Sequence, residues 1–394
     1  MSEASAHKLA YIVETTRGTV PTNPRFKSLP DTRTTLALTK ESLPSERLTG
    51  SRFPAEPRTG ASLVGGEIPV DLSSRTYDDF IASALQGEWV EADATNDSVT
   101  IEVDAVATTG AEVADTFVTT SGTVTVESID AKGQEVVLTY VEGTDPPVTF
   151  EIFGLGSVTI DGEVFEVTAY TDTAEDATVK AGDTRKSFSV IREFSDFVGG
   201  TPFLLFSGCE VASWGLSASA NSLVKSTFTF FGREMVGPSA AAPTGTTYTP
   251  AIDSEAFDTF SGVAKIDGVA SCIITEFALN VNNGHAPKYA VGCATPQDAS
   301  VGQSLIDGSI TLYLEDATML TKFVDETGLA LEFEFADSAG NKMVISLPNL
   351  KIGSGTQADV TGDGPISIPV NFTAHKGQTL GSHISVRRVS PLAV

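Results

Sequence analysis

Short runs in which apolar and polar residues alternate, each closed by glycine, proline or aspartate, recur along most of this chain. Successive side chains of a β-strand point to opposite faces, so alternation with a period of two predicts half-buried strands. The clearest runs lie at residues 187–191, 209–219, 225–231, 260–266, 271–282, 304–314, 329–336, 341–347 and 365–374. A chain of 394 residues with this texture is expected to fold as a mainly β protein.

Two short segments have the apolar spacing of helices instead. In residues 76–87, apolar side chains recur at i, i+3, i+4, i+7 and i+8, Thr76 is expected to cap the start, and Gly87 to end the helix in the left-handed conformation. Residues 316–326 show a similar apolar face and precede Gly328. We therefore expect short helices flanking the β-structure.

The acidity of the chain is concentrated in one segment. Residues 91–184 hold 20 acidic and 2 basic side chains, a net charge of −18 within a total of −26. Alternating runs and the turn Asp161-Gly162 predict strands and a hairpin inside this segment. We interpret 91–184 as a small acidic β domain inserted into a core made of 61–90 and 185–394. Such a segment should repel nucleic acid, anionic membranes and its own copies.

The first 60 residues look different from the rest. Six prolines and six arginines are spread between Thr15 and Ser62, and prolines disfavour both a helix and a central strand. We predict an extended N-terminal arm over residues 1–60, with one short strand near 34–39, that lies on a neighbouring subunit. A flexible tail is the alternative, although apolar residues such as Phe26 and Phe53 favour burial. A chain lacking residues 1–60 is expected to fold but not to polymerise.

A pair of weak internal similarities suggests duplication. Gly66-x-Ile68-x-x-x-Leu72 before a helix is similar to the pattern that begins at Gly308, and the pattern that begins at Cys209 is similar to the one at Cys272. Alternating strands also produce such matches by chance. If the duplication is real, the core consists of two pseudo-repeated halves with a break near residues 237–250.

No residue pattern in the chain predicts catalysis. The four histidines lie near the termini, in a turn and at a strand end, and no nucleophile motif or phosphate-binding glycine loop is present. Three widely spaced cysteines form neither a disulfide framework nor a zinc site. A glycine-rich turn containing Asp359 and Asp363 is a weak candidate for Ca²⁺, but it lacks a closing glutamate. We expect no enzyme activity and no cofactor.

No apolar stretch reaches the roughly 20 residues that a membrane helix needs, and no secretory leader is visible. The protein is therefore expected to fold in a cytosol and to have no membrane partner. Its acidic balance makes tight binding of DNA unfavourable.

The order of several motifs resembles phage tail tube proteins. Residues 11–21 (YIVETTRGTVP) and 41–47 (ESLPSER) are similar to the opening of that family, and residues 65–72 (GGEIPVDL) to the strand before its helix. Segments 188–197, 206–211 and 228–232 resemble its later part, whereas 91–184 departs from a minimal member.

The resemblance implies a β-sandwich or partly closed barrel whose subunits form rings, usually of six, that stack into a hollow tail tube. DNA would pass through the lumen without tight binding. The implied partners are copies of the chain and other tail proteins such as the tail tip, tape measure and terminator, and the implied place is the virion tail after assembly in the bacterial cytoplasm. The candidate interface residues are Arg17, Phe26, Arg47, Phe53, Ile68, Val70 and Leu72.

Two other classes of function stay open at this point. A secreted or surface β-sandwich binding module, such as an adhesin or a carbohydrate-binding domain, would share the acidic, threonine-rich composition. A glycan-degrading enzyme would need two positioned carboxylates, and nothing in the sequence selects a pair.

Overall fold

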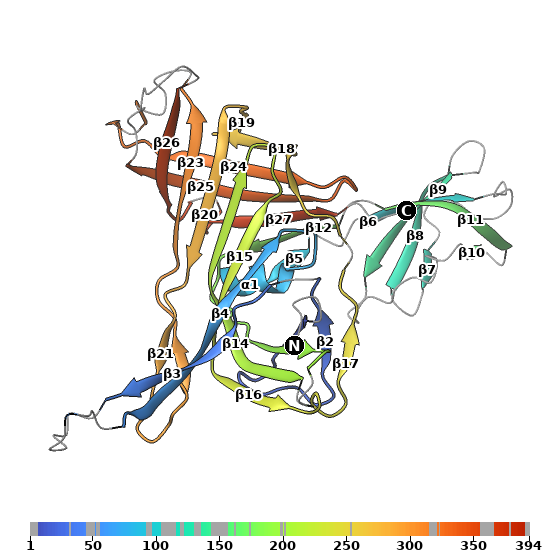
Figure 1. The fold of residues 1–394 in the computed structure, drawn as a ribbon. Coiled ribbons are helices and arrows are strands. Elements are labelled where there is room, and N and C mark those ends of the chain that lie inside the picture. The colour runs from blue at the N-terminus through green and yellow to red at the C-terminus, as the bar shows by residue number, and fades with distance from the viewer. Residues whose placement is uncertain are drawn as a thin grey trace. The chain divides into compact units, whose positions relative to one another are not determined.

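The computed structural model confirms a mainly β protein with two compact units (Figure 1). The first unit comprises residues 1–89, 179–338 and 342–386, and the second comprises 90–178, 339–341 and 387–394. The structure describes residues 7–30, 33–44, 52, 56–91, 97–103, 116–118, 122–129, 135–142, 157–160, 163–172, 175–197, 200, 202–252, 254–314, 321–322, 324–354, 366–377 and 380–390, with the backbone alone between 91 and 176.

The described elements follow the alternating runs of the sequence closely. In chain order they are β1 (His7–Val13), β2 (Arg25–Ser28), β3 (Ala37–Leu43), β4 (Arg58–Asp71), α1 (Asp78–Leu85), β5 (Trp89–Glu91), β6 (Asp97–Val103), β7 (Thr116–Val118), β8 (Gly122–Ile129), β9 (Glu135–Glu142), β10 (Ser157–Ile160), β11 (Glu163–Asp172), β12 (Glu175–Lys180), β13 (Phe188–Phe194), β14 (Phe203–Ser219), β15 (Lys225–Gly232), β16 (Glu234–Ser239), β17 (Thr247–Thr249), β18 (Asp258–Ile266), β19 (Val269–Ala270), β20 (Ile274–Asn282), β21 (Ala286–Lys288), β22 (Asp298–Ser300), β23 (Leu305–Tyr313), β24 (Leu329–Ala336), β25 (Lys342–Ser354), β26 (Ser367–Ala374) and β27 (Ser385–Ser390).

One long strand, β14, organises the first unit. Its N-terminal half pairs with β13 and β16, and its C-terminal half pairs with β15 and β20. From β14 the sheet runs one way through β15, β4 and β3, and the other way through β20, β23, β26, β25, β24 and β18. A further branch continues from β13 to β1, β2 and β17, in which β2 and β17 are parallel. The strand β14 therefore joins two sheet regions into one unit.

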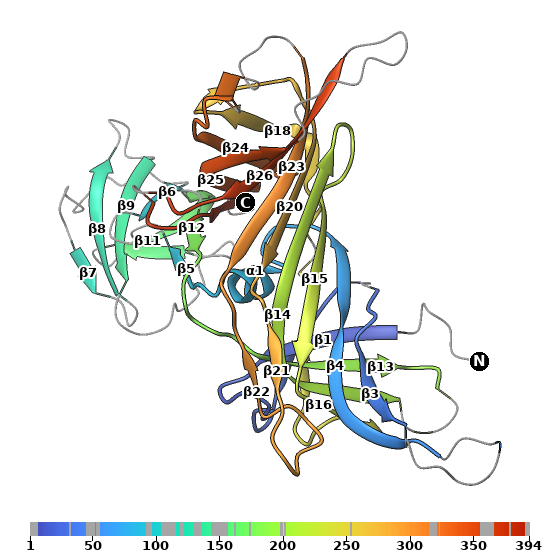
Figure 2. The same cartoon turned by 90° about the vertical axis from the view of Figure 1, so that its left-hand side faces the viewer.

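The core of the first unit is centred on α1. This helix contacts β14 and β20 (Figure 2) and buries Phe80 completely. The Phe80 ring meets the rings of Phe188, Phe228 and Phe230 edge-on, with centroids 5.1–5.5 Å apart. Edge-to-face geometry is favourable for aromatic pairs beyond their burial alone. The apolar face predicted for residues 76–87 is thus the face that packs against the sheet.

The two ends of α1 differ from the expectation. The N-cap residue is Tyr77, with no side-chain cap, and the Thr76 hydroxyl lies 3.2 Å from the Ser74 carbonyl oxygen instead. At the other end the left-handed residue is Gln86, with φ of 50°. Gly87 has a different role, because a Cβ there would lie 2.1 Å from the carbonyl oxygen of Lys180. Glycine is needed at this position for close backbone approach. Most of the second predicted helix, residues 316–326, lies outside the described residues.

The N-terminal segment, predicted to be an extended arm on a neighbouring subunit, pairs instead with strands of its own chain. The strand β1 pairs along its whole length with β13, and β2 pairs with β1. Leu9, Tyr11, Phe26 and Leu36 are buried within the chain's own fold. Prolines interrupt this segment between the strands rather than within them, so short strands are compatible with the proline count. Deletion of residues 1–60 is therefore expected to remove part of the core.

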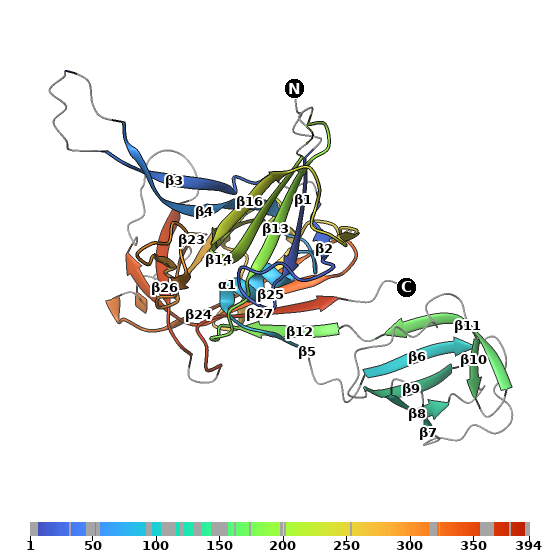
Figure 3. The ribbon, with the colours of Figure 1, turned by 90° about the horizontal axis from the view of Figure 1, so that it is seen from below.

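The second unit contains a separate antiparallel sheet (Figure 3). Its strand order is β10, β11, β6, β9, β8, β7. The turn Asp161-Gly162 joins β10 to β11, which pair from Ser157 to Ile160. The unit begins at residue 90 and its main segment ends at 178, whereas the sequence places the domain at 91–184. The C-terminal boundary differs because Val179 of β12 belongs to the core of the first unit, where it is fully buried.

The two halves expected from an internal repeat have different neighbours in the sheet. The similar patterns lie on β4 and β14 in the first half and on β23 and β20 in the second. The strand β15 separates β4 from β14, whereas β23 pairs directly with β20. A shared origin of the two halves stays a prediction.

Candidate assembly surfaces

The residues predicted to form an interface lie in three settings. Phe26, Ile68, Val70 and Leu72 are buried in the core, so their side chains support the strands that carry them and do not face outward. Arg17 lies in a loop and belongs to a cluster of charges. Arg47 and Phe53, together with the weak Ca²⁺ candidates Asp359 and Asp363, lie outside the described residues. The interface role of these positions stays a prediction.

The charged cluster is built around the carboxylate of Glu210 on β14, whose side chain is 4% exposed. Arg17 Nε lies 2.5 Å from Glu210 Oε1, and Arg185 donates to both oxygens at 3.1 and 2.9 Å. His285 Nε2 lies 3.2 Å from Oε2. Burial raises the pKa of Glu210, but the His285 hydrogen bond and the two arginines outweigh it and hold that pKa below its usual value. The cluster thus contains a buried carboxylate that stays charged.

A second carboxylate extends the cluster to the hairpin β21–β22. Asp298 lies 2.9 Å from Arg17, 3.3 Å from Arg185 and 3.8 Å from Lys288. Through Glu210 and Asp298, Arg17 connects its loop to β14 and to the hairpin. The sequence singled out Arg17 as an interface residue, but the acidic partners, about 190 and 280 positions away, were not identified.

Glu14 holds the base of the same loop. Its carboxylate accepts hydrogen bonds from the backbone of Gly18 and Gly208 and from the hydroxyls of Ser187 and Ser189, at 2.6–2.9 Å. Four donors around one buried carboxylate satisfy its charge without a cation. The segment YIVETTRGTVP therefore has a structural role in which Glu14 and Arg17 fix the loop between β1 and β2.

The ribbon β3–β4 and the hairpin β21–β22 contact one another. The strand β3 is exposed along nearly all of its length. The Ser62 backbone N–H of β4 donates to the Ala294 carbonyl at 2.8 Å, and the Tyr289 hydroxyl lies 3.4 Å from the Ser62 carbonyl. The exposed strand β3 is therefore a candidate surface for contact with another chain.

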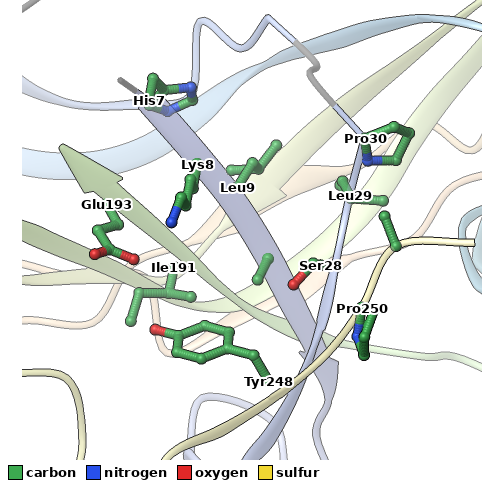
Figure 4. Close-up of a pocket in the computed structure, with 12 residues that line it drawn as sticks. His7, Lys8, Leu9, Ser28, Leu29, Pro30, Ile191, Glu193, Tyr248 and Pro250 are labelled. Carbon is green, nitrogen blue, oxygen red and sulfur yellow. The ribbon is translucent and has the colours of Figure 1, made fainter. Parts of the chain in front are cut away.

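A cavity of about 510 Å³ lies beside β1, on the sheet region that contains the N-terminal half of β14. Its lining comes from β1, β2, β13 and β17 and from the residues after β2 and β17, and includes His7, Lys8, Leu9, Ala10, Ser28, Leu29, Pro30, Ile191, Glu193, Tyr248, Pro250 and Ala251 (Figure 4). Ala10 and Ile191 are buried, whereas Lys8 is exposed and Tyr248 is 43% exposed. The cavity thus has an apolar base and a charged rim.

The described residues contain no arrangement that suggests catalysis or metal binding. Within them, no group of three or more His, Cys, Asp or Glu side chains could hold a metal ion. His383 lies 3.2 Å from Ser304, and His7 accepts a hydrogen bond from Arg192, so both have structural contacts. Burial raises the pKa of the Cys209 thiol, which opposes thiolate chemistry. Among the described helices, none is long and apolar enough to cross a membrane.

The fold and the charged cluster define a mainly β structural protein whose ionic groups hold loops and hairpins in place. A family model described as phage tail tube protein matches residues 4–374, and the chain belongs to that family. It is accordingly a structural, non-enzymatic component of the virion tail, as the sequence resemblance predicted. No curated protein matches the chain.

Proposed function

We propose that this protein self-assembles into rings, expected to contain six subunits, that stack into the tail tube through which phage DNA passes. The observation that carries the proposal is the family match across residues 4–374. The exposed strand β3 supports it, because a strand with little burial of its own is stabilised by contact with a neighbour. The expected partners are copies of the chain, the tail tip, the tape measure and the terminator.

The charge of the chain supports passage of DNA without tight binding. Outside residues 91–184 the net charge is −8, so a lumen formed by many copies of this part repels phosphates unless basic groups gather there. Residues 91–184 contribute −18 to the total of −26. We propose that this segment lies away from the contacts between subunits, because like charges of that density oppose close packing.

Negative-stain electron microscopy of the purified chain over a concentration series tests the proposal. Rings or uniform hollow tubes are expected. A chain that remains monomeric at the highest concentration would contradict self-assembly. The family match favours this function over the alternative of a surface binding module, which would be a monomer.

A further inference from the structure

An exposed aromatic side chain on β18 is held outward by the local backbone. Phe260 is 73% exposed, the largest fraction among the aromatic residues of the described chain. The pairing of β18 with β24 shifts between Asp258 and Val263, which is an irregularity of the bulge type. The Asp258 carboxylate accepts hydrogen bonds from the backbone of Phe260 at 3.0 Å and of Ser261 at 2.6 Å. A bulge of this type re-aims a side chain, so the orientation of Phe260 is built into the strand.

The bulge is also packed tightly against its neighbour. A Cβ at Gly262 would lie 1.9 Å from the carbonyl oxygen of Glu334 on β24. Val263, which is 40% exposed, borders the same surface hollow as Phe260, and Leu223, which is 45% exposed, forms a β-bridge with Asp258. Rigid aromatic residues anchor interfaces effectively, because little conformational entropy is lost when they are buried. Phe260 therefore has the properties of an interface anchor.

The anchor and the cavity beside β1 lie at opposite ends of β14. Glu193, which lines the cavity, pairs with Phe203 at the first residue of β14. Thr259, the residue before Phe260, donates a hydrogen bond at 2.9 Å to the carbonyl of Ser219, the last residue of β14. In Figure 1, β18 is accordingly in the upper part of this unit, and β2 and β17 are lower. One molecule thus carries a projecting aromatic residue at one end and an apolar cavity at the other.

Charged side chains flank both regions. Glu276 and Glu334 lie beside Phe260, and Lys8 and Glu193 lie at the cavity. Lys8 therefore offers one charge opposite in sign to the carboxylates beside Phe260, which favours contact with the other end of a second copy.

We propose that Phe260 of one subunit inserts into the cavity lined by β1, β2, β13 and β17 of the next subunit. The occupant is a second copy of this chain, so the inference deepens the proposed self-assembly and rests on it. The aromatic ring would pack on Ala10, Ile191 and Tyr248, and a cavity of about 510 Å³ is large enough to receive it. A contact between different surfaces of identical subunits propagates as a stack when successive copies do not close into a ring.

Two single variants and their mixture test this contact. Phe260→Ala removes the anchor but keeps the cavity, and Ala251→Trp fills the cavity but keeps the anchor. Each variant alone is expected to lose stacking, with an apparent dissociation constant raised at least about 30-fold. Their equimolar mixture is expected to form discrete pairs of subunits, or of rings, because one productive contact per pair remains. Sedimentation velocity and electron microscopy distinguish monomers or single rings, pairs and tubes.

Val269→Ala is the matched control, because Val269 is 70% exposed on the neighbouring strand β19. It should form tubes like the wild type, and circular dichroism and thermal melting should show that all three variants fold. Folded Phe260→Ala or Ala251→Trp chains that form normal tubes, or a mixture that forms no pairs, would overturn the inference while leaving self-assembly intact. A wild-type chain that never associates would overturn the proposed function itself.

Discussion

At the scale of residues, the buried carboxylate of Glu210 has ionic contacts with several side chains. Its side chain is 4% exposed and is contacted by Arg17, Arg185 and His285. Removing one member of a buried ion pair leaves the remaining charges without compensation, which typically costs 3–5 kcal/mol. Because Arg17 and Arg185 are 20% and 35% exposed, water compensates part of that loss.

The substitution Glu210→Gln is therefore expected to lower the free energy of unfolding by about 3 kcal/mol. Urea denaturation measures the change. Glu332→Gln is the matched control, because Glu332 pairs with Lys265 at 2.6 Å and both side chains are 35% exposed. Exposed pairs contribute about 0–1 kcal/mol. Equal effects of the two substitutions would show that burial of Glu210 does not strengthen its contacts.

The same carboxylate predicts a dependence on pH. Burial raises the pKa of Glu210, but the contacts from His285, Arg17 and Arg185 hold it below the ordinary value of 4.5. A carboxyl whose folded-state pKa is lowered stabilises the fold above the ordinary value, and this stability is lost as pH falls below it. Stability should thus decrease more steeply below about pH 4.5 in the wild type than in Glu210→Gln. Denaturant titrations over that range measure both slopes, and parallel slopes would refute the assignment.

At the scale of elements, the end of α1 depends on close contact between two backbone segments. A Cβ at Gly87 would lie 2.1 Å from the Lys180 carbonyl oxygen, so neither segment can remain in place when a methyl group is added. Gly87→Ala is expected to lower the free energy of unfolding by about 1–3 kcal/mol. Gly353→Ala is the control, because nothing lies within 4 Å of its Cβ position. Thermal unfolding of both variants measures the difference, and equal melting temperatures would contradict the contact.

The aromatic cluster under α1 gives a second test at this scale. Phe80 is fully buried among three other rings, and truncation of a buried phenylalanine typically costs about 3–5 kcal/mol. Phe260→Ala, in contrast, should change the stability of the isolated subunit by less than about 0.5 kcal/mol, since Phe260 is 73% exposed. Denaturant unfolding of the isolated subunits compares them. A large effect of Phe260→Ala would place that side chain in the subunit's own core.

At the scale of the whole molecule, the boundary of the acidic unit decides which deletion is tolerated. Removing residues 92–174 and joining the ends with a short glycine–serine linker keeps β12, whose Ala177 and Val179 are fully buried. We expect this chain to fold and to form tubes. A deletion that extends to residue 184 also removes β12 and is expected to destabilise the core. Electron microscopy and circular dichroism test both chains, and failure of a folded 92–174 deletion to assemble would assign the acidic unit a role in assembly.

The sequence by itself determined the strands, the helix α1 and the family. Alternation and turn residues are local properties, so the strands β13, β14, β15, β18, β20, β23, β24, β25 and β26 appear close to the positions that the pattern predicted. The family motifs are equally local, because residues 11–21 and 41–47 carry them without reference to any partner. The helix ends were predicted less well, because Gly87 is required by a strand more than 90 residues away.

The tertiary structure alone decided where the N-terminal segment and the charged residues go. Prolines in residues 1–60 predicted an arm on a neighbour, but the pairing of β1 with β13 joins segments about 180 positions apart, and long-range pairing has no local signal. The same holds for Glu210 and Asp298, which meet Arg17 across 193 and 281 positions, and for the cavity, which four separate strands enclose. Local patterns follow from backbone geometry, whereas contacts between distant segments depend on how the sheets close on one another.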